Sequence, residues 1–155
     1  MKSLRILGFT ALVFAFSPAL LAADFGVRAG HYNDMDENFV GAEVLFDLGS
    51  INVNPNIEYS LADNVTAGSA NVDITVNVGK FSRVSPYVGA GVGIWYTDDN
   101  NPGGNTTDLL GNLIGGVQVD LAFLKPYAQV KYFRLIKNDG GQKEDDLALT
   151  VGLRF

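Results

Sequence analysis

Cysteine is absent from this 155-residue chain, and histidine occurs only once, at His31. Without cysteine the chain cannot form a disulfide framework or a thiolate metal site. A single histidine excludes a multi-histidine metal site. Lys and Arg number 11 against 17 Asp and Glu, and the formal net charge of −6 argues against a nucleic-acid partner, which binds a basic surface. We therefore predict no metal site, no cofactor, no catalytic residues and no nucleic-acid partner.

A hydrophobic run long enough to span a membrane as a helix is also lacking. The longest one covers residues 6–16, follows Lys2 and Arg5, and is interrupted by Pro18 before two small residues at 22 and 23. This pattern is typical of a secretory signal peptide, and the run is too short for a membrane anchor, the alternative interpretation. We predict that segment 1–23 is removed, which leaves nine basic and 17 acidic residues and a formal charge of −8.

Apolar and polar residues alternate strictly through much of the remaining chain. In "INVNPNIEYSLA", residues 51–62, the apolar side alternates with a side made mostly of asparagine, and "NVDITVNVGK", residues 71–80, repeats the pattern. A period of two is the signature of a strand with one apolar face. No amphipathic helix of any length is indicated after residue 23.

Eight such segments are predicted, and most have the 9–11 residues that a tilted strand needs to cross a bilayer. They are 24–32, 39–48, 51–62, 70–80, 86–97, 108–121, 125–136 and 146–155. Four longer polar connections alternate with three shorter turns. This alternation predicts an all-β fold, an eight-stranded antiparallel up-and-down transmembrane β-barrel over residues 24–155, with both termini on the short-turn side.

The sequence resembles the small outer-membrane β-barrels of the OmpA/OmpX-like class. The resemblance rests on the signal segment, the eight alternating strands, the order of long and short connections, and the C-terminal "VGLRF". In that class a terminal phenylalanine with apolar residues at alternate positions resembles the signal read by the barrel-assembly machinery. The matching positions here are Leu149, Val151, Leu153 and Phe155. The resemblance implies a monomer in the outer membrane with periplasmic termini, delivered by periplasmic chaperones and surrounded by lipids and lipopolysaccharide.

Alternation alone does not say which face points outward, because a lipocalin-like soluble barrel has the same period with its apolar face inside. The polar face here is rich in Asn and Gln, whereas a solvated outer face usually carries many Lys and Glu. We therefore expect the apolar face to contact lipid and the polar face to be enclosed. The enclosed ionic set is then Arg28, Glu43, Glu58, Asp73, Asp120, Lys131 and Arg154, with Asp47 on the same face.

An eight-stranded barrel is just wide enough for side chains to fill it. We expect a paired, hydrogen-bonded plug, with a narrow gated channel through the same ion pairs as the alternative. Gly89, Gly91 and Gly93 share the inward face and are expected to make room for long side chains such as Lys131 or Tyr127. Trp95 and Tyr127 are also expected to face inward, while other aromatic residues near strand ends form interfacial girdles.

The longer connections are acidic, which suits exposed loops or divalent-cation bridges to lipopolysaccharide phosphates. Mobility and no preformed site are expected between Thr97 and Asp108. Some outer-membrane barrels are enzymes, and His31 with Ser60 or Ser69 and Asp63 would be the best triad available. No flanking motif supports that triad. We therefore predict a non-enzymatic barrel with a structural or surface-interaction role through its acidic extracellular loops, and a channel or a lipid-modifying enzyme as the alternatives.

Overall fold

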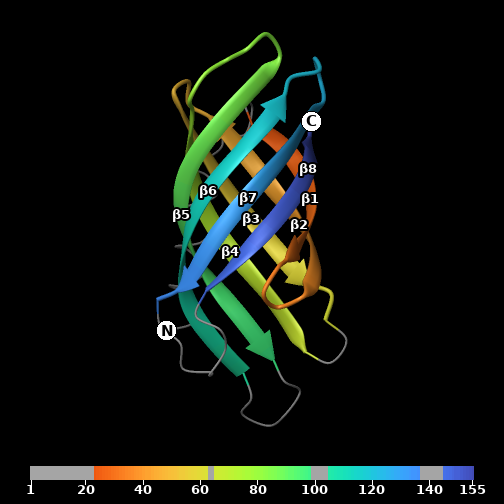
Figure 1. Ribbon diagram of the computed structural model, residues 1–155, viewed down its shortest axis with the longest axis vertical. Helices are drawn as coiled ribbons and strands as arrows, with labels where there is room; N and C mark the ends of the chain where they lie inside the picture. The colour runs from red at the N-terminus through yellow and green to blue at the C-terminus, as the bar shows by residue number, and fades with distance from the viewer. Residues whose placement is uncertain (1–22, 63–64, 99–104, 137–144) are drawn as a thin grey trace, which may run out of the picture.

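The structure, a computed structural model, describes residues 23–62, 65–98, 105–136 and 145–155, so most of the predicted signal segment lies outside it. Eight antiparallel strands in this part of the chain close into a barrel, each pairing with the next and β8 with β1 (Figure 1). The strands are β1 (Ala23–Tyr32), β2 (Glu37–Asp47), β3 (Ile51–Ser60), β4 (Thr66–Asn77), β5 (Val84–Asp98), β6 (Asn105–Val119), β7 (Lys125–Leu135) and β8 (Asp145–Arg154). The predicted fold class is confirmed.

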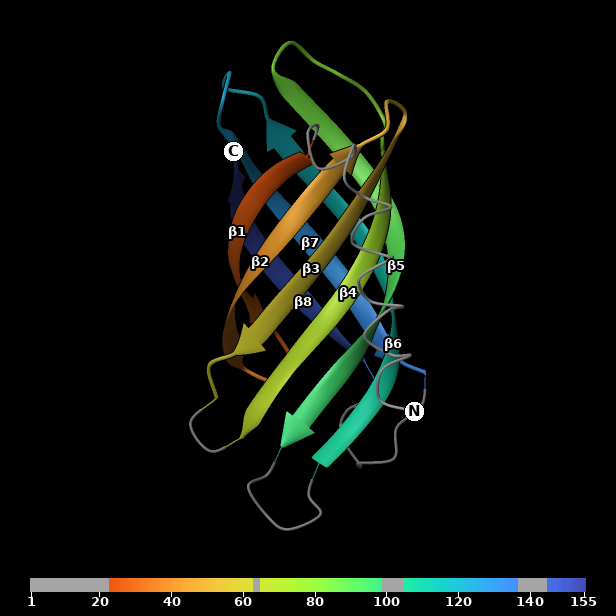
Figure 2. The ribbon, with the colours of Figure 1, turned by 180° about the vertical axis from the view of Figure 1, so that it is seen from behind.

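The barrel has two distinct ends, which we call the terminus end and the loop end. Ala23, Phe155 and the three short turns lie at the terminus end, near the C label in Figure 1. The strand ends at Tyr32, Ser60, Asp98 and Leu135, from which the four longer connections start, lie at the loop end. Figure 2 shows the same division from behind, with the strands strongly tilted between the two ends.

β5 and β6 are the longest strands, and both extend beyond their predicted bounds toward the loop end. β5 and β6 have 15 residues each, and their pairing continues through Thr97↔Thr106 to Asp98↔Asn105. Thr97, Asp98 and residues 105–108 of the segment expected to be a mobile loop are therefore paired strand. β-branched threonines favour an extended backbone, and Thr97 also accepts a 3.1 Å hydrogen bond from the indole nitrogen of Trp95. Residues 99–104 lie outside the described part.

The outer wall of the barrel is apolar along most of its height. Val72, Ile57 and Val151 expose 47, 60 and 62% of their surface, as do similar residues on every strand. No α-helix of the length and apolarity needed to cross a membrane occurs in the described part of the chain. Because the apolar residues point outward, the soluble lipocalin-like alternative, which needs an apolar interior, does not fit this barrel.

Aromatic residues on the outer wall differ between the two ends. Tyr59, Tyr96 and Tyr132 are exposed toward the loop end, whereas the terminus end carries exposed phenylalanines, namely Phe25, Phe81, Phe123 and Phe155. Trp95 and Tyr127 point inward, as expected. Tyr32, Phe39 and Tyr87 also lie near strand ends, where girdle residues are expected, but they are buried inside because they share strand parity with the enclosed polar set.

Candidate functional site

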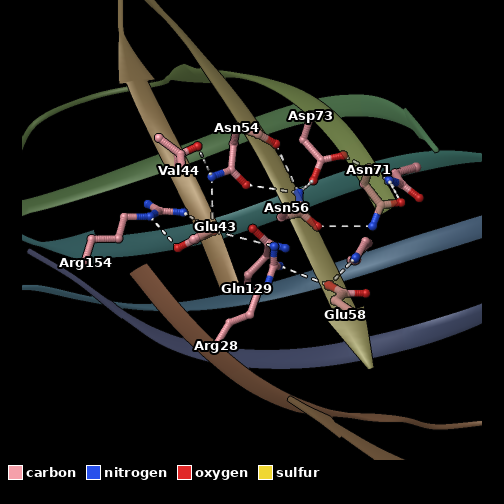
Figure 3. Close-up of polar contacts among 12 residues, drawn as sticks. Arg28, Glu43, Val44, Asn54, Asn56, Glu58, Asn71, Asp73, Gln129 and Arg154 are labelled. Carbon is pink, nitrogen blue, oxygen red and sulfur yellow. Dashed lines mark hydrogen bonds and ion pairs between the residues drawn. The ribbon is translucent and has the colours of Figure 1, made fainter. Parts of the chain in front are cut away.

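The candidate site is the lumen, which the inward residues of all eight strands fill in three layers. Arg28, Glu43, Glu58, Lys131 and Arg154 form a charged layer at mid-height, shown in part in Figure 3. An aromatic plug lies toward the loop end, and a polar cavity lies toward the terminus end. Strand parity decides which residues enter these layers, since every second residue of each strand points inward. The position of a residue along its strand decides the layer to which it belongs.

The charged layer is built from two close ion pairs joined by a third cation. Arg154 Nε donates to Glu43 at 2.8 Å, and Lys131 Nζ donates to Glu58 at 2.5 Å. The guanidinium of Arg28 lies between them, 3.6 Å from Glu43 and 3.4 Å from Glu58 (Figure 3). All five side chains are buried. Buried charges must be paired, because an unpaired one loses its hydration without compensation.

Asparagine amides continue this layer across β3, β4 and β6. We call Asn54, Asn56, Asn71 and Asn112 the amide ladder. Asn56 and Asn112 each donate to one oxygen of Asp73, at 2.8 and 2.9 Å, while Asn54 donates to Glu43 at 3.1 Å. Asn71 donates to Asn56 at 3.1 Å. The ladder therefore connects Asp73 to the ion pairs and satisfies its charge with neutral donors.

The inward glycines of β5 face the lumen, but the side chains nearest to them are not those of Lys131 or Tyr127, as expected. A Cβ at Gly91 would collide with the Asp73 carboxylate, and one at Gly93 with the Asn71 amide. The absence of a Cβ at these glycines therefore leaves space for the side chains of β4, the paired strand, because cross-strand partners are the nearest neighbours in a sheet. Tyr127 instead packs over Gly152, and the Arg154 guanidinium lies 4.0 Å from the centroid of the Tyr127 ring.

The aromatic plug consists of Tyr32, Phe39, Trp95 and Phe133. Tyr32 stacks on Phe39 with ring centroids 4.5 Å apart, and its edge meets Trp95 and Phe133 at 5.3 and 5.7 Å. The Tyr32 hydroxyl donates to Glu58 at 2.9 Å, which ties the plug to the charged layer. Such offset and edge-on pairs are favourable beyond their buried area. The plug closes the lumen toward the loop end.

The turn between β1 and β2 is held across the plug by Asp146 of β8. One carboxylate oxygen accepts from the Asp34 amide at 2.7 Å, and the other accepts from the Met35 amide at 3.1 Å. The same side chain accepts from the amide of Leu147 at 2.6 Å. Met35 packs against the plug from this position. A buried acid therefore fixes the turn through charge-assisted hydrogen bonds.

The polar cavity at the terminus end has a volume of about 390 Å³. Arg154 and Tyr87 contribute to its wall, together with Asp24, Asp47 and Lys125. A salt bridge joins Lys125 to Asp24 at 2.5 Å. Arg154 is the one residue of the charged layer that lines the cavity, so the cavity lies on the terminus side of that layer.

The predicted ionic set is not one uniform layer. Arg28, Glu43, Glu58, Lys131 and Arg154 come together at mid-height, and Asp73 joins them through the amide ladder. Asp120 lies apart from them at the terminus end, where its carboxylate is 3.7 Å from Lys80 Nζ. Gln118 connects it to the charged layer, because the Gln118 side chain accepts from Arg154 at 2.7 Å and donates to Asp120 at 2.9 Å. Asp47 also lies at that end and is exposed.

The residues of the possible triad lie on different faces of the wall. His31 is on the outer wall, where Nδ1 lies 3.1 Å from the Asn38 amide oxygen. Ser60 is on the inner face and donates to Glu37 at 2.5 Å. Ser69, also inside, donates to Glu58 at 3.2 Å, and Asp63 lies outside the described residues. Within the part described, the fold thus binds both serines to glutamates and keeps them on the face opposite His31.

Sequence reasoning missed the aromatic plug. Tyr32, Phe39 and Phe133 share the parity of Arg28, Glu43 and Lys131 on their own strands, so the alternation already contained that signal. The residues proposed as an assembly signal, Leu149, Val151, Leu153 and Phe155, lie together on the outer side of β8 and at its end. Leu149, Val151 and Phe155 are exposed there, and Leu153 is half-buried.

No known family model matches the sequence, and no curated protein matches it either. Solved structures do match. Neisserial surface protein A (NspA) superposes with a TM-score of 0.73 at 14% identity, covering 86% of this chain and 96% of that one. The N-terminal barrel domain of Pseudomonas aeruginosa OprF gives 0.64 at 16% identity, covering 86% and 96%. A major outer membrane protein of Thermus thermophilus gives 0.51 at 14%, covering 86% and 99%. The chain therefore has the fold of small outer-membrane β-barrels.

Proposed function

We propose that this protein is a non-enzymatic barrel of the outer membrane, with a structural or surface-interaction role carried by its acidic loop end. One observation carries the proposal: the outer wall is apolar while the lumen is filled from the charged layer to the aromatic plug. An apolar wall is stable against lipid tails, and a closed sheet leaves no backbone group unpaired there. A filled lumen favours a role at the surface over passage through the barrel.

The loop end is proposed to face the cell exterior and the terminus end the periplasm. Acidic residues such as Asp34, Asp36 and Glu37 gather at the loop end. The outward apolar row on β8 ends at Phe155, where a periplasmic assembly factor would reach it. The matched NspA is called a surface protein, which agrees with a role outside the cell.

Labelling of single cysteines tests this placement, because the natural chain has none. In Asp36→Cys the thiol lies in the turn at the loop end, and in Ser82→Cys it lies in a turn at the terminus end. With an impermeant maleimide on intact cells, we expect the first variant to react and the second to react only after the outer membrane is permeabilised. The reverse result would refute the orientation. If neither labelled variant is recovered in the membrane fraction, the placement of the barrel in the membrane is refuted.

Heat-modifiable gel migration tests the folded barrel, and conductance tests the filled lumen. A folded barrel resists mild SDS and shifts on boiling. In planar bilayers we expect no stable open state, since a gap in the charged layer would leave buried charges unpaired.

A narrow channel is the second candidate, and the polar cavity favours it, because this cavity extends into the lumen from the terminus end as far as Arg154. A stable conductance that increases when Trp95 is replaced by Gly would establish this alternative. Conductance unchanged by that substitution would place any current outside the lumen.

A lipid-modifying enzyme is the third candidate, and the separation of His31 from Ser60 and Ser69 argues against it. We expect the lipid A of cells that produce the His31→Ala variant to be identical by mass spectrometry to that of cells that produce the natural protein. A lipid A modification that depends on His31 would make the protein an enzyme.

A further inference from the structure

A groove of about 490 Å³ crosses the outer wall from β6 over β7, β8 and β1 to Asn38 of β2. β6, β7 and β8 lie side by side at the front of Figure 1. The floor of the groove is made by small residues, Ala29, Gly115 and Ala128. A Cβ built on Gly115 would meet nothing within 4 Å, so the wall is bare at that point. Val130 and Val151 contribute apolar sides.

Two adjacent rows of cross-strand neighbours line the groove, and Ala128, Val151 and Ala29 belong to one of them. The other row runs from the apolar belt to the loop end. Gly115 pairs with Val130, Val130 with Leu149, Leu149 with His31, and His31 with Asn38 of β2. Five strands spaced by about 4.8 Å give a row of roughly 19 Å, comparable with the roughly 15 Å depth of one leaflet's hydrocarbon. The row thus has the length of an acyl chain.

The two ends of the row differ in chemistry. Gly115 lies in the middle of β6, within the apolar belt. His31 lies next to the last residue of β1, and Asn38 lies next to the first residue of β2. Both are toward the loop end, where tyrosines are exposed on the outer wall. His31 Nδ1 and Asn38 Oδ1 are 3.1 Å apart, and both side chains remain accessible from outside. A polar end at the interface and an apolar end in the hydrocarbon match the two parts of a lipid.

A second copy of this chain fits the groove poorly. A two-fold dimer on this face would set groove against groove and enclose a void, because an isologous interface uses the same patch twice. An acyl chain is flexible and fills a concave apolar surface, gaining dispersion contacts that a flat wall does not offer. The neighbouring Asp36, whose carboxylate is 3.6 Å from His31 Nε2, disfavours an anionic phosphate directly at this point. A neutral amide or hydroxyl near the chain is the better match.

We propose that this groove binds one hydroxylated, amide-linked acyl chain of lipopolysaccharide, with His31 and Asn38 hydrogen-bonded to its amide and hydroxyl groups. The proposal rests on the placement of the loop end in the outer leaflet. Apolar contact alone does not select a lipid in a bilayer, since all tails are equally apolar. Selection comes from the polar end, and the bare floor at Gly115 sets where the chain lies.

The test is native mass spectrometry of the folded full-length protein in detergent, incubated with equal amounts of lipid A and a phospholipid of matched chain length. We expect one lipid A retained per barrel in preference to the phospholipid. Gly115→Leu fills the groove from its floor and is expected to abolish that retention. Ala70→Leu is the matched control, a small outward residue on β4 outside the groove, and is expected to leave retention unchanged. His31→Leu is expected to weaken retention about fivefold, the effect of one hydrogen bond.

Each opposing result has one meaning. Equal retention by the natural protein and Gly115→Leu, or no retention by either, overturns the groove as a site, provided that the heat-modifiable shift shows both to be folded. Retention of the phospholipid as strongly as lipid A overturns the role of His31 and Asn38. A dimer that Gly115→Leu abolishes would make the groove a protein interface. Because the assay uses the isolated barrel, its failure is distinct from a failure of the orientation, which cysteine labelling decides in cells.

Discussion

Lys131 is the residue whose removal should cost this barrel most. Its ammonium group is buried and donates to Glu58 at 2.5 Å. In Lys131→Met the aliphatic stem remains, but Glu58 keeps a negative charge with only Arg28, at 3.4 Å, and the Tyr32 and Ser69 hydroxyls as partners. We expect a loss of about 3–5 kcal/mol in the free energy of unfolding, measured by urea titration in lipid vesicles. The double variant with Glu58→Gln should recover part of the loss. A Lys131→Met barrel as stable as the natural one would contradict the charged layer.

Ala122 has an unfavourable backbone conformation, with a positive φ. The turns 81–84 and 121–124 are closed by paired backbone hydrogen bonds, and Ser82 and Ala122, at the same place in each, have φ values of 60° and 56°. Glycine adopts a positive φ without the steric cost of a Cβ. We therefore expect Ala122→Gly to stabilise the protein by about 0.5–1 kcal/mol in the same titration. Ala128→Gly, in a strand, is the control and should destabilise it.

At the scale of elements, the turn between β1 and β2 depends on a side chain from β8. Asp146 accepts from the Asp34 and Met35 amides, although more than 100 residues separate them. In Asp146→Ala both amides lose their acceptor, and we expect their hydrogen exchange to accelerate by at least about tenfold, the effect of losing hydrogen bonds to a charged group. Asp145→Ala, which removes the exposed acceptor of Tyr132, is the control. Unchanged exchange in Asp146→Ala would show that the turn is held by Met35 packing alone.

For the whole molecule, the decisive property is which face of the sheet meets lipid. Val72 points outward at mid-height and is bordered by Pro55 and Val92 on the adjacent strands. Val72→Arg places a charge in hydrocarbon, and we expect a cost of about 2–4 kcal/mol for folding into vesicles. The matched variant Tyr59→Arg, near the interface at the loop end, should cost about 0–1 kcal/mol. Equal costs at both positions would contradict a membrane-spanning belt.

The fold was predictable because each strand repeats the same simple rule. Residues such as Val72, Ile74, Asn71 and Asp73 alternate with the period of a strand, and the period gives both the element and its faces. The loop-end extensions of β5 and β6 were not predictable, because Asp98, Asn105 and Thr106 are polar like a loop and become strand only through their pairing. The same holds for the neighbours of Gly91, which depend on register rather than on spacing.

The sequence by itself determined the strands, the two faces of each strand, and the residues that share each face. These follow from alternation, a local property that each strand carries alone. Only the tertiary structure decided which charges pair, that Tyr32, Phe39, Trp95 and Phe133 close one end, that Asp146 reaches the β1–β2 turn, and that a groove crosses five strands. Those features join residues from different strands, and their positions are set by the register with which the sheet closes.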